Sequence, residues 1–372
     1  MPTTKNDISK IQACIQNTLD RKAIGKKQIV GIIGDAPSHY AKSPPIWNSV
    51  FQQLRLEAIY LPFDVEESRL AALLDTIKKS SHVMGANVTV PYKIKVIPFL
   101  DGLDEKAAQI KAVNTIVRTG DGRLIGYNTD GSGFIESLVS TAPGQTEPFL
   151  NTVQGMDVLL IGSGGSGRAV AFYLAELIGK GKLFISNRTP GTANSLAEEI
   201  FRSFRNGAAV AEEKIPKLAQ RVGLIINCSV KGQGGIRKLP KGKMTILEPY
   251  SGLAPAQPVT YSDSDSVDPS FYRKWLAASQ SDIEENNRRS LTISLSASPD
   301  TRFYDLIYHP LETVFLRHGR LSGHATMNGK VMNIAQAVDG FAEKICKGYL
   351  QDHGRLNART RDRIYEIMSE AW

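Results

Sequence analysis

A glycine-rich turn between an apolar strand and a helix is the feature that most constrains the fold of this chain. The sequence GSGGSGR (Gly162–Arg168) follows MDVLLIG and precedes an apolar stretch with helical spacing. Gly162, Gly164 and Gly167 satisfy G-x-G-x-x-G, whose glycines permit a tight turn, a close approach of a pyrophosphate and helix–strand packing. The free N–H groups and the dipole at the helix start favour phosphates. The pattern therefore predicts a dinucleotide-binding βαβ unit.

The residues after the next strand indicate which dinucleotide binds. A site for NAD carries an acidic side chain about twenty residues after the glycines, where it binds the ribose 2′-hydroxyl. Here the strand KLFIS ends in Asn187-Arg188-Thr189 and no carboxylate is present. A guanidinium can form a forked pair with a 2′-phosphate, and a threonine can add a hydrogen bond. The sequence favours NADP, and it favours this role for Arg188 over that of a solvated surface arginine.

Two polar islands precede the glycine turn, NVTVPYK (Asn87–Lys93) and NTDGSGF (Asn128–Phe134). Each contains one titratable group, Lys93 or Asp130, among amides and hydroxyls. A lysine after a strand end can move a proton to or from a substrate hydroxyl, and a carboxylate can orient it. Either residue alone indicates a surface lysine or a turn aspartate. Together with a dinucleotide site, they predict an oxidoreductase that acts on a polyhydroxylated compound.

Composition limits the class of protein. A chain of 372 residues can form two domains, and no apolar run approaches the ~20 residues of a membrane span. Polar residues interrupt Met1–Lys27, so we expect no signal peptide. The three cysteines lack CxxC spacing, which fits a reducing, cytoplasmic location. The histidines lack metal-ligand spacing and no basic stripe carries aromatics, so we expect neither a metal nor a nucleic-acid partner.

Alternating strands and helices predict an α/β protein. In the first part of the chain we expect helices at 5–24, 44–55 and 68–79, and strands at 28–34, 58–65, 84–90, 112–118 and 123–128, the last two joined as a hairpin by TGDG. A linker rich in proline, glycine and polar residues spans 141–154. The alternation then resumes and continues to a strand at 304–308. Residues 251–300 carry YSDSDSVDPS beside one amphipathic stretch, which predicts an insertion with a partly flexible loop.

Several stretches match, in order, the motifs of one enzyme family. They are AKSPPIWN, GANVTVPYK, AVNTIV, GYNTDGSGF, GSGGSGRAV, SNRT, INCSVKG, YDLIYHPLETVFL and NGKVMNIAQA. From about Ile29 to Ala342 the chain resembles the shikimate dehydrogenases, including their quinate-using relatives. The resemblance implies NADP-dependent oxidation of the C3 hydroxyl of shikimate to 3-dehydroshikimate, and the reverse reduction, in aromatic amino-acid biosynthesis.

The resemblance also implies a domain plan and a set of site residues. We expect a two-domain α/β fold: an N-terminal extension and substrate-binding domain at 1–140, an NADP-binding Rossmann domain at 152–325 with the insertion near 251–300, and C-terminal helices at 326–372 that return to the first domain. Lys93 and Asp130 match the catalytic pair. Substrate positions are Ser43, Thr89, Asn114 and Gln336, with Tyr308 close by. Cofactor positions are Gly162, Gly164, Gly165, Gly167, Asn187, Arg188 and Thr189, and Gly329 and Met332 line the nicotinamide side.

Two residues depart from the family pattern. Ala41 stands where the family has a serine that binds the substrate carboxylate, and Trp47 where a histidine is usual. Losing one of two hydroxyls weakens carboxylate binding by about 1 kcal/mol, for which Ser38 or Tyr40 could compensate. The substrate is a small cyclic hydroxy acid, either shikimate or a related compound such as quinate or an amino-shikimate. A non-catalytic metabolite sensor is a further alternative, against which the intact Lys93 and Asp130 speak, and a homodimer stays open.

Overall fold

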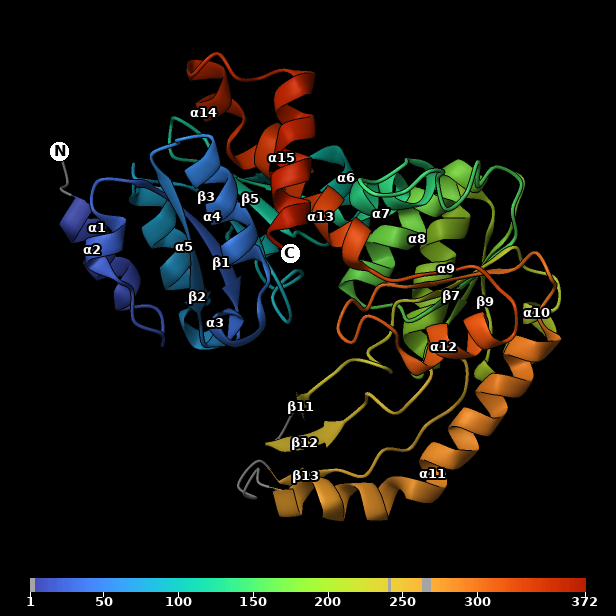
Figure 1. Ribbon diagram of the computed structural model, residues 1–372. Helices are drawn as coiled ribbons and strands as arrows, with labels where there is room; N and C mark the ends of the chain where they lie inside the picture. The colour runs from blue at the N-terminus through green and yellow to red at the C-terminus, as the bar shows by residue number, and fades with distance from the viewer. Residues whose placement is uncertain (1–3, 240–241, 263–268) are drawn as a thin grey trace. The chain divides into compact units, whose positions relative to one another are not determined.

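The computed structural model describes residues 4–239, 242–262 and 269–372, and the chain divides into two compact units (Figure 1). Unit 1 comprises Met1–Pro148 and Met332–Trp372, and unit 2 comprises Phe149–Val331. The first boundary lies in the stretch 141–154, which contains no helix or strand. The second lies inside helix α13 (Lys330–Asp339). The predicted α/β fold with two domains is confirmed.

Unit 1 is built on a six-stranded mixed sheet in the order β2-β1-β3-β5-β6-β4. Its strands are β1 (Gln28–Gly34), β2 (Ala58–Asp64), β3 (Val83–Val88), β4 (Gly102–Leu103), β5 (Thr115–Arg118) and β6 (Leu124–Tyr127). Strand β1 is parallel to β2 and β3, whereas β5 is antiparallel to both β3 and β6. The hairpin expected around TGDG is therefore present as β5–β6.

Helices cover this sheet and carry the polar loops. They are α1 (Thr4–Gln12), α2 (Arg21–Ile24), α3 (Pro37–Tyr40), α4 (Ser43–Gln53), α5 (Leu70–Lys79), α6 (Glu105–Ile110), α7 (Asp130–Val139), α13, α14 (Lys347–Asp352) and α15 (Ala358–Glu370), with a π-helical segment at Gly340–Ile345. The single helix expected over 5–24 is wrong. Between α1 and α2 the chain instead hydrogen-bonds to β2, because Gln16 N donates to Asp64 O and the Asn17 amide donates to Pro62 O.

Unit 2 contains a six-stranded sheet in the order β15-β14-β10-β7-β8-β9, whose neighbouring strands all pair in parallel. Its strands are β7 (Val158–Ile161), β8 (Leu183–Ser186), β9 (Gly207–Ala209), β10 (Leu224–Asn227), β14 (Arg302–Asp305) and β15 (Thr326–Met327), and the connecting helices include α8 (Gly165–Ile178), α9 (Pro190–Phe204), α10 (Ile215–Ala219) and α12 (Val314–Leu321). Counted from β7, this is the 3-2-1-4-5-6 order of doubly wound nucleotide-binding sheets. The predicted Rossmann architecture is confirmed.

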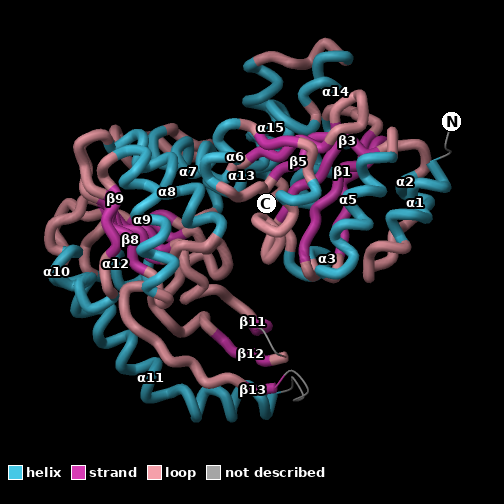
Figure 2. Tube along the Cα trace, turned by 180° about the vertical axis from the view of Figure 1, so that it is seen from behind, coloured by secondary structure: helices cyan, strands magenta, loops and turns pink. Residues whose placement is uncertain are grey.

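Between β10 and β14 the chain forms an additional structure, which we call the insertion module. It comprises a small antiparallel sheet of β11 (Ile236–Leu239), β12 (Lys243–Ile246) and β13 (Tyr261–Ser262), followed by the 28-residue helix α11 (Pro269–Ser296) (Figure 2). The insertion thus begins earlier than the expected residue 251. Part of the predicted flexible loop, 263–268, lies outside the described residues. No described helix, α11 included, is long and apolar enough to cross a membrane.

A separate apolar cluster holds the insertion module together. Met244 and Tyr250 pack there with Phe271 and Trp275 of α11. The Trp275 ring is 1% exposed and lies edge-on to Tyr250, with the ring centroids 6.4 Å apart. Its Nε1 donates to Val259 O at 3.0 Å. One side chain therefore supplies both the packing and a polar tie between helix and loop.

We expect Trp275→Ala to lower the free energy of unfolding by about 3–5 kcal/mol, because it opens a cavity and removes the donor to Val259. Urea unfolding followed by circular dichroism measures the loss. Lys274→Ala, at the exposed neighbouring position, is the matched control and should change the stability little. Equal effects of the two substitutions would contradict a structural role for the Trp275 cluster.

Candidate active site

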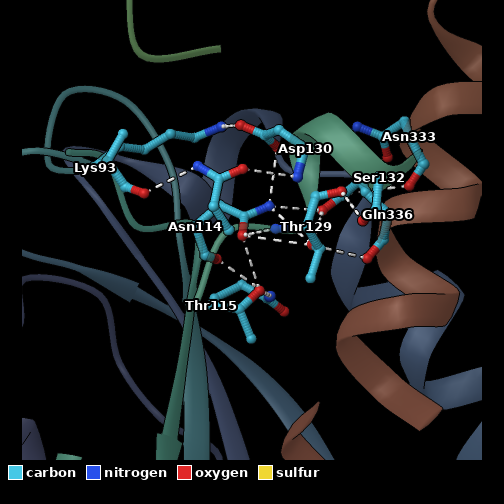
Figure 3. Close-up of polar contacts among 11 residues, drawn as sticks. Lys93, Asn114, Thr115, Thr129, Asp130, Ser132, Asn333 and Gln336 are labelled. Atoms are coloured by element: carbon cyan, nitrogen blue, oxygen red, sulfur yellow. Dashed lines mark hydrogen bonds and ion pairs between the residues drawn. The ribbon is translucent and has the colours of Figure 1, made fainter. Parts of the chain in front are cut away.

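The two titratable groups of the polar islands form an ion pair in unit 1 (Figure 3). Lys93 Nζ donates to Asp130 Oδ2 at 2.6 Å. The lysine side chain is 15% exposed and the aspartate side chain 6% exposed. Because little water reaches the pair, the two charges attract each other more strongly than they would at the surface. The pair also keeps the lysine nitrogen at a fixed position.

The strand order of unit 1 explains why these residues meet. Asn87 near the end of β3 lies opposite Thr115 at the start of β5, and Thr115 in turn lies opposite Tyr127 at the end of β6. The loops that carry Lys93 and Asp130 therefore leave the sheet at the same edge. Asp130 is the first residue of α7, where the helix dipole favours a carboxylate.

Asn114, just before β5, fixes the aspartate. Its Nδ2 donates to Asp130 Oδ1 at 2.9 Å and to Gln336 Oε1 at 3.1 Å. Its Oδ1 accepts from the backbone N of Thr129 at 2.8 Å. The amide is 3% exposed and its hydrogen-bonding groups are engaged within the protein. Asn114 is therefore placed to orient Asp130.

Helices α7 and α13 approach closely beside this pair. Thr129 Oγ1 donates to Gln336 O at 3.0 Å, and Ser132 Oγ donates to Asp339 Oδ2 at 2.7 Å. A Cβ atom on Gly133 would come within 2.6 Å of Gln336 N, so only glycine permits this approach. The structure thus brings Gln336, from near the end of the chain, together with Lys93, Asn114 and Asp130.

A buried tyrosine that the sequence did not predict extends the polar network. The Tyr60 hydroxyl donates to Asn87 Oδ1 at 2.9 Å, and Asn87 Nδ2 donates to Thr115 Oγ1 at 3.1 Å. Burial raises the pKa of Tyr60, which a hydrogen bond with Ser43 partly opposes. The phenol therefore stays neutral. Its only sequence signal is a hydroxyl on the inward-facing side of the alternating strand β2.

The two departures from the family pattern have different structural settings. Trp47 is 1% exposed and packs on Tyr60 and Phe341, with centroid distances of 4.8 and 4.9 Å. Trp47 therefore belongs to an aromatic cluster that contacts the polar network through Tyr60. Ala41 ends the short helix α3 in an extended conformation and presents no hydroxyl.

Neither proposed substitute for the missing serine has a free hydroxyl. Ser38 Oγ donates to the buried Asp64 Oδ2 at 2.5 Å, and Tyr40 OH donates to Asp35 Oδ1 at 2.9 Å. The expectation that Ser38 or Tyr40 could compensate therefore finds no support. In contrast, the Thr89 hydroxyl, on the half-buried residue that follows β3, has no hydrogen-bond partner among the described residues.

The glycine turn of unit 2 follows β7 and has the backbone geometry that its sequence predicts. Gly162 has φ +106°, and a Cβ there would lie 2.7 Å from the carbonyl carbon of Cys228. A Cβ on Gly167 would lie 2.3 Å from Gly162 O. A Cβ on Gly164, by contrast, would meet no atom within 4 Å, and α8 starts at Gly165, where the first N–H groups of a helix have no partner within the helix. The turn therefore presents donors and room for a phosphate.

The strand end after β8 combines a tethered amide with an exposed cation. Asn187 Oδ1 accepts from Ser163 N at 3.3 Å, and its Nδ2 donates to Thr192 Oγ1 at 2.6 Å. Arg188 and Thr189 are exposed, and the Arg188 guanidinium has no hydrogen-bond or ion-pair partner among the described residues. The cation lies one residue from the amide that holds the glycine turn, a position suited to an anionic group.

The other predicted site residues lie at the ends of β14 and β15. A Cβ on Gly329 would come within 2.0 Å of Leu306 O, so glycine is required beside the segment that carries Tyr308. Burial raises the pKa of Tyr308. Met332 is 6% exposed and is the first residue of the second segment of unit 1. In the described parts of the chain, no three histidine, cysteine or acidic side chains gather as metal ligands.

Comparison with known proteins identifies the family. Residues 32–116 match the model of the shikimate dehydrogenase substrate binding domain. The NADP⁺ shikimate dehydrogenase of Desulforamulus reducens is 34% identical over 317 residues, which cover 85% of this chain and 89% of that protein. The chain belongs to the shikimate dehydrogenase family. The Carboxydothermus hydrogenoformans member is likewise 34% identical over 85% of this chain and 91% of its own.

A solved structure of the family extends the likeness to the fold. The shikimate 5-dehydrogenase of Thermus thermophilus, solved in complex with NADP(H) and shikimate, is 25% identical to this chain. The match covers 93% of this chain and 100% of that one, with a TM-score of 0.62. This family member therefore has the fold of its relatives.

We expect Asn114→Leu to destabilise unit 1 by about 2–4 kcal/mol, because it leaves Thr129 N unpaired and removes a donor from the buried Asp130. Urea unfolding measures the change. Asn194→Leu, at an exposed position on α9, is the control. An Asn114→Leu protein as stable as the control would show that the amide does not support the ion pair.

Proposed function

We propose that this protein catalyses the NADP-dependent oxidation of the C3 hydroxyl of shikimate to 3-dehydroshikimate, and the reverse reduction. The observation that carries the proposal is the shielded Lys93–Asp130 pair at 2.6 Å, in a chain that also contains a nucleotide-binding sheet. The reaction requires one group to handle a proton and a second to accept a hydride. When bound in unit 2, NADP⁺ would supply the acceptor for the hydride.

Lys93 is the proposed proton carrier. The ion-paired ammonium of Lys93 is the acid form, so oxidation begins after Lys93 has given one proton to water. The neutral Lys93 amine then takes the proton of the C3 hydroxyl, while the C3–H bond breaks with loss of hydride and the C–O double bond forms. During reduction the ammonium returns the proton to the same oxygen. Asp130 compensates the charge that appears on Lys93, and Asn114 keeps the carboxylate in position. The arrangement removes the need for the side chains to reorganise during the transfer.

Substrate recognition is assigned to hydroxyl and amide groups of unit 1. Thr89 supports this assignment because its hydroxyl has no protein partner among the described residues, and Ser43 is half-buried beside Tyr60. Gln336 uses its side-chain oxygen on Asn114, and its Nε2 donates to Asn333 O at 3.1 Å. In this proposal Asn114 positions Asp130 more than it binds substrate, because its amide is engaged within the protein.

Cofactor binding is assigned to unit 2. The open side of Gly164 and the N–H groups at the start of α8 would hold the pyrophosphate, and Asn187, Arg188 and Thr189 would bind around the 2′-phosphate. The exposed Arg188, without a partner in the described part of the chain, supports NADP in preference to NAD, since an available guanidinium matches a phosphate group. In this proposal Gly329 and Met332 contact the nicotinamide side.

A related cyclic acid, quinate or an amino-shikimate, is the second candidate substrate. One observation favours it: Ala41 removes a carboxylate ligand, and the nearby hydroxyls of Ser38 and Tyr40 are bonded to Asp64 and Asp35. A substrate with an additional hydroxyl or an amine could gain contacts that the missing serine does not provide. We further propose a cytoplasmic location, which the three free cysteines support.

We expect the purified protein to reduce NADP⁺ with shikimate, and Lys93→Ala to lower kcat by about 10²–10⁴ while the protein stays folded. Absorbance at 340 nm measures the rate for shikimate, quinate and amino-shikimate with each dinucleotide. Lys95→Ala is the control, because Lys95 lies in the same loop as Lys93 and forms an exposed ion pair with Glu67.

The outcome distinguishes three possibilities. Turnover of shikimate that is lost only in Lys93→Ala supports the proposal. Turnover of quinate or amino-shikimate alone would assign the second candidate substrate and a changed carboxylate contact at Ala41. Binding of shikimate without any turnover would contradict the enzyme and favour a metabolite sensor.

We expect Arg188→Leu to raise the KM for NADP⁺ by about 10–100-fold, since a charged hydrogen bond to phosphate contributes about 1.5–3 kcal/mol. The KM for NAD⁺ should stay the same, because NAD lacks the 2′-phosphate. Steady-state kinetics with both dinucleotides test this. A parallel rise in both KM values would mean that Arg188 supports the fold of the turn and does not select the cofactor.

A further inference from the structure

A pocket of ≈380 Å³ lies in unit 2, between the insertion module and the segment that leads into α12. Its apolar wall comprises Ile246, Tyr272, Trp275 and Leu276 of the insertion module, together with Pro310 and Val314. The ribbon and the tube both show α11, which supplies three of these residues, beginning next to β13 (Figures 1 and 2). The volume falls within the range of small-molecule sites. The residues proposed for catalysis and cofactor binding take no part in the lining.

Pro249 and three charged residues, Glu248, Glu312 and Arg317, complete the lining. Glu248 is exposed, and its carboxylate has no hydrogen-bond or ion-pair partner among the described residues. Glu312 is shared by two arginines. Arg320 donates twice to this carboxylate, from Nε to Oε1 at 2.6 Å and from Nη2 to Oε2 at 3.3 Å. Arg317 donates once, from Nε to Oε2 at 3.4 Å. One carboxylate cannot neutralise two guanidinium groups, so Arg317, whose side chain is 54% exposed, keeps unmatched positive charge.

The pocket therefore combines one unmatched negative group and one unmatched positive group with an apolar wall. A ligand that carries only an ammonium group would use Glu248 and leave Arg317 unmatched, and a simple carboxylate would do the opposite. A zwitterion satisfies both. Tyr272, 48% exposed, and the neighbouring Leu276, 54% exposed, offer an uncovered apolar surface to the body of such a ligand. Two aromatic rings prefer to pack edge-on or offset, and such a pair contributes more binding free energy than the burial of its apolar area alone.

We propose that this pocket binds an α-amino acid with an aromatic side chain. The ammonium group pairs with Glu248, the α-carboxylate pairs with Arg317, and the ring lies against Tyr272 and Leu276. This site is independent of the proposed dehydrogenase activity, because Lys93 belongs to unit 1 and Arg188 does not line the pocket.

Isothermal titration calorimetry of the full chain with L-phenylalanine tests the proposal. We expect one site per chain, with Glu248→Gln and Arg317→Gln each weakening binding at least tenfold. Phenethylamine, which lacks the carboxylate, and 3-phenylpropionate, which lacks the ammonium group, should each bind at least tenfold more weakly than phenylalanine. Leu276→Trp, at an exposed position of the wall, should fill the pocket and abolish binding.

Controls separate this site from the rest of the molecule. Glu198 and Arg202 form an exposed ion pair on α9. Glu198→Gln and Arg202→Gln should therefore leave phenylalanine binding unchanged. Lys93→Ala and saturating shikimate should also leave it unchanged. Absence of binding at millimolar phenylalanine in the folded protein would overturn the proposal. Competition by shikimate would overturn it too, as would equal binding of phenethylamine with no effect of Arg317→Gln.

Discussion

The shielded ion pair of Lys93 and Asp130 is the interaction on which the arrangement of unit 1 depends. Charges taken out of water lose hydration, and an ion pair recovers this loss only when further hydrogen bonds satisfy the groups. Asp130 meets this condition through the Asn114 amide and the start of α7. Gln336 closes the network through Asn114 and Thr129, so a residue from near the end of the chain helps to hold a pair formed in its first half.

A different constraint shapes unit 2, where close backbone contacts decide the residue type. Side chains at Gly162, Gly167 and Gly329 would collide with neighbouring backbone, and these glycines fix the turn after β7 and the segment before α13. Gly164 meets no such neighbour, and Arg188 has no protein partner among the described residues. Packing explains why glycine stands at the first three positions. It does not explain Gly164 or Arg188, whose open surroundings are understandable if a ligand occupies the space beside them.

How much could be predicted from the sequence depends on the kind of signal. The glycine turn and the apolar strands follow from local rules, and the bounds of β1 agree with the expectation to the residue. The meeting of Lys93 with Asp130 follows from their places after strands of one sheet, whereas their catalytic roles stay predictions. The break between α1 and α2 was not predictable, because tertiary contacts with β2 override local helical periodicity there. The π-helical turn at Gly340–Ile345 was not predicted either.

Helix α11 and its contacts show why the insertion module was the hardest part to predict. Its buried face includes Ser279, Asn286 and Ser290, so the apolar periodicity that marks an amphipathic helix is weak. Asn286 instead binds backbone, since its Nδ2 donates to Ala254 O at 3.0 Å. Lys231, the lysine of the family motif INCSVKG, donates to the same carbonyl oxygen at 2.7 Å, and burial lowers its pKa, which Glu212 opposes. The insertion module is therefore joined to the nucleotide-binding sheet through a shared backbone partner, and it forms an integral part of unit 2.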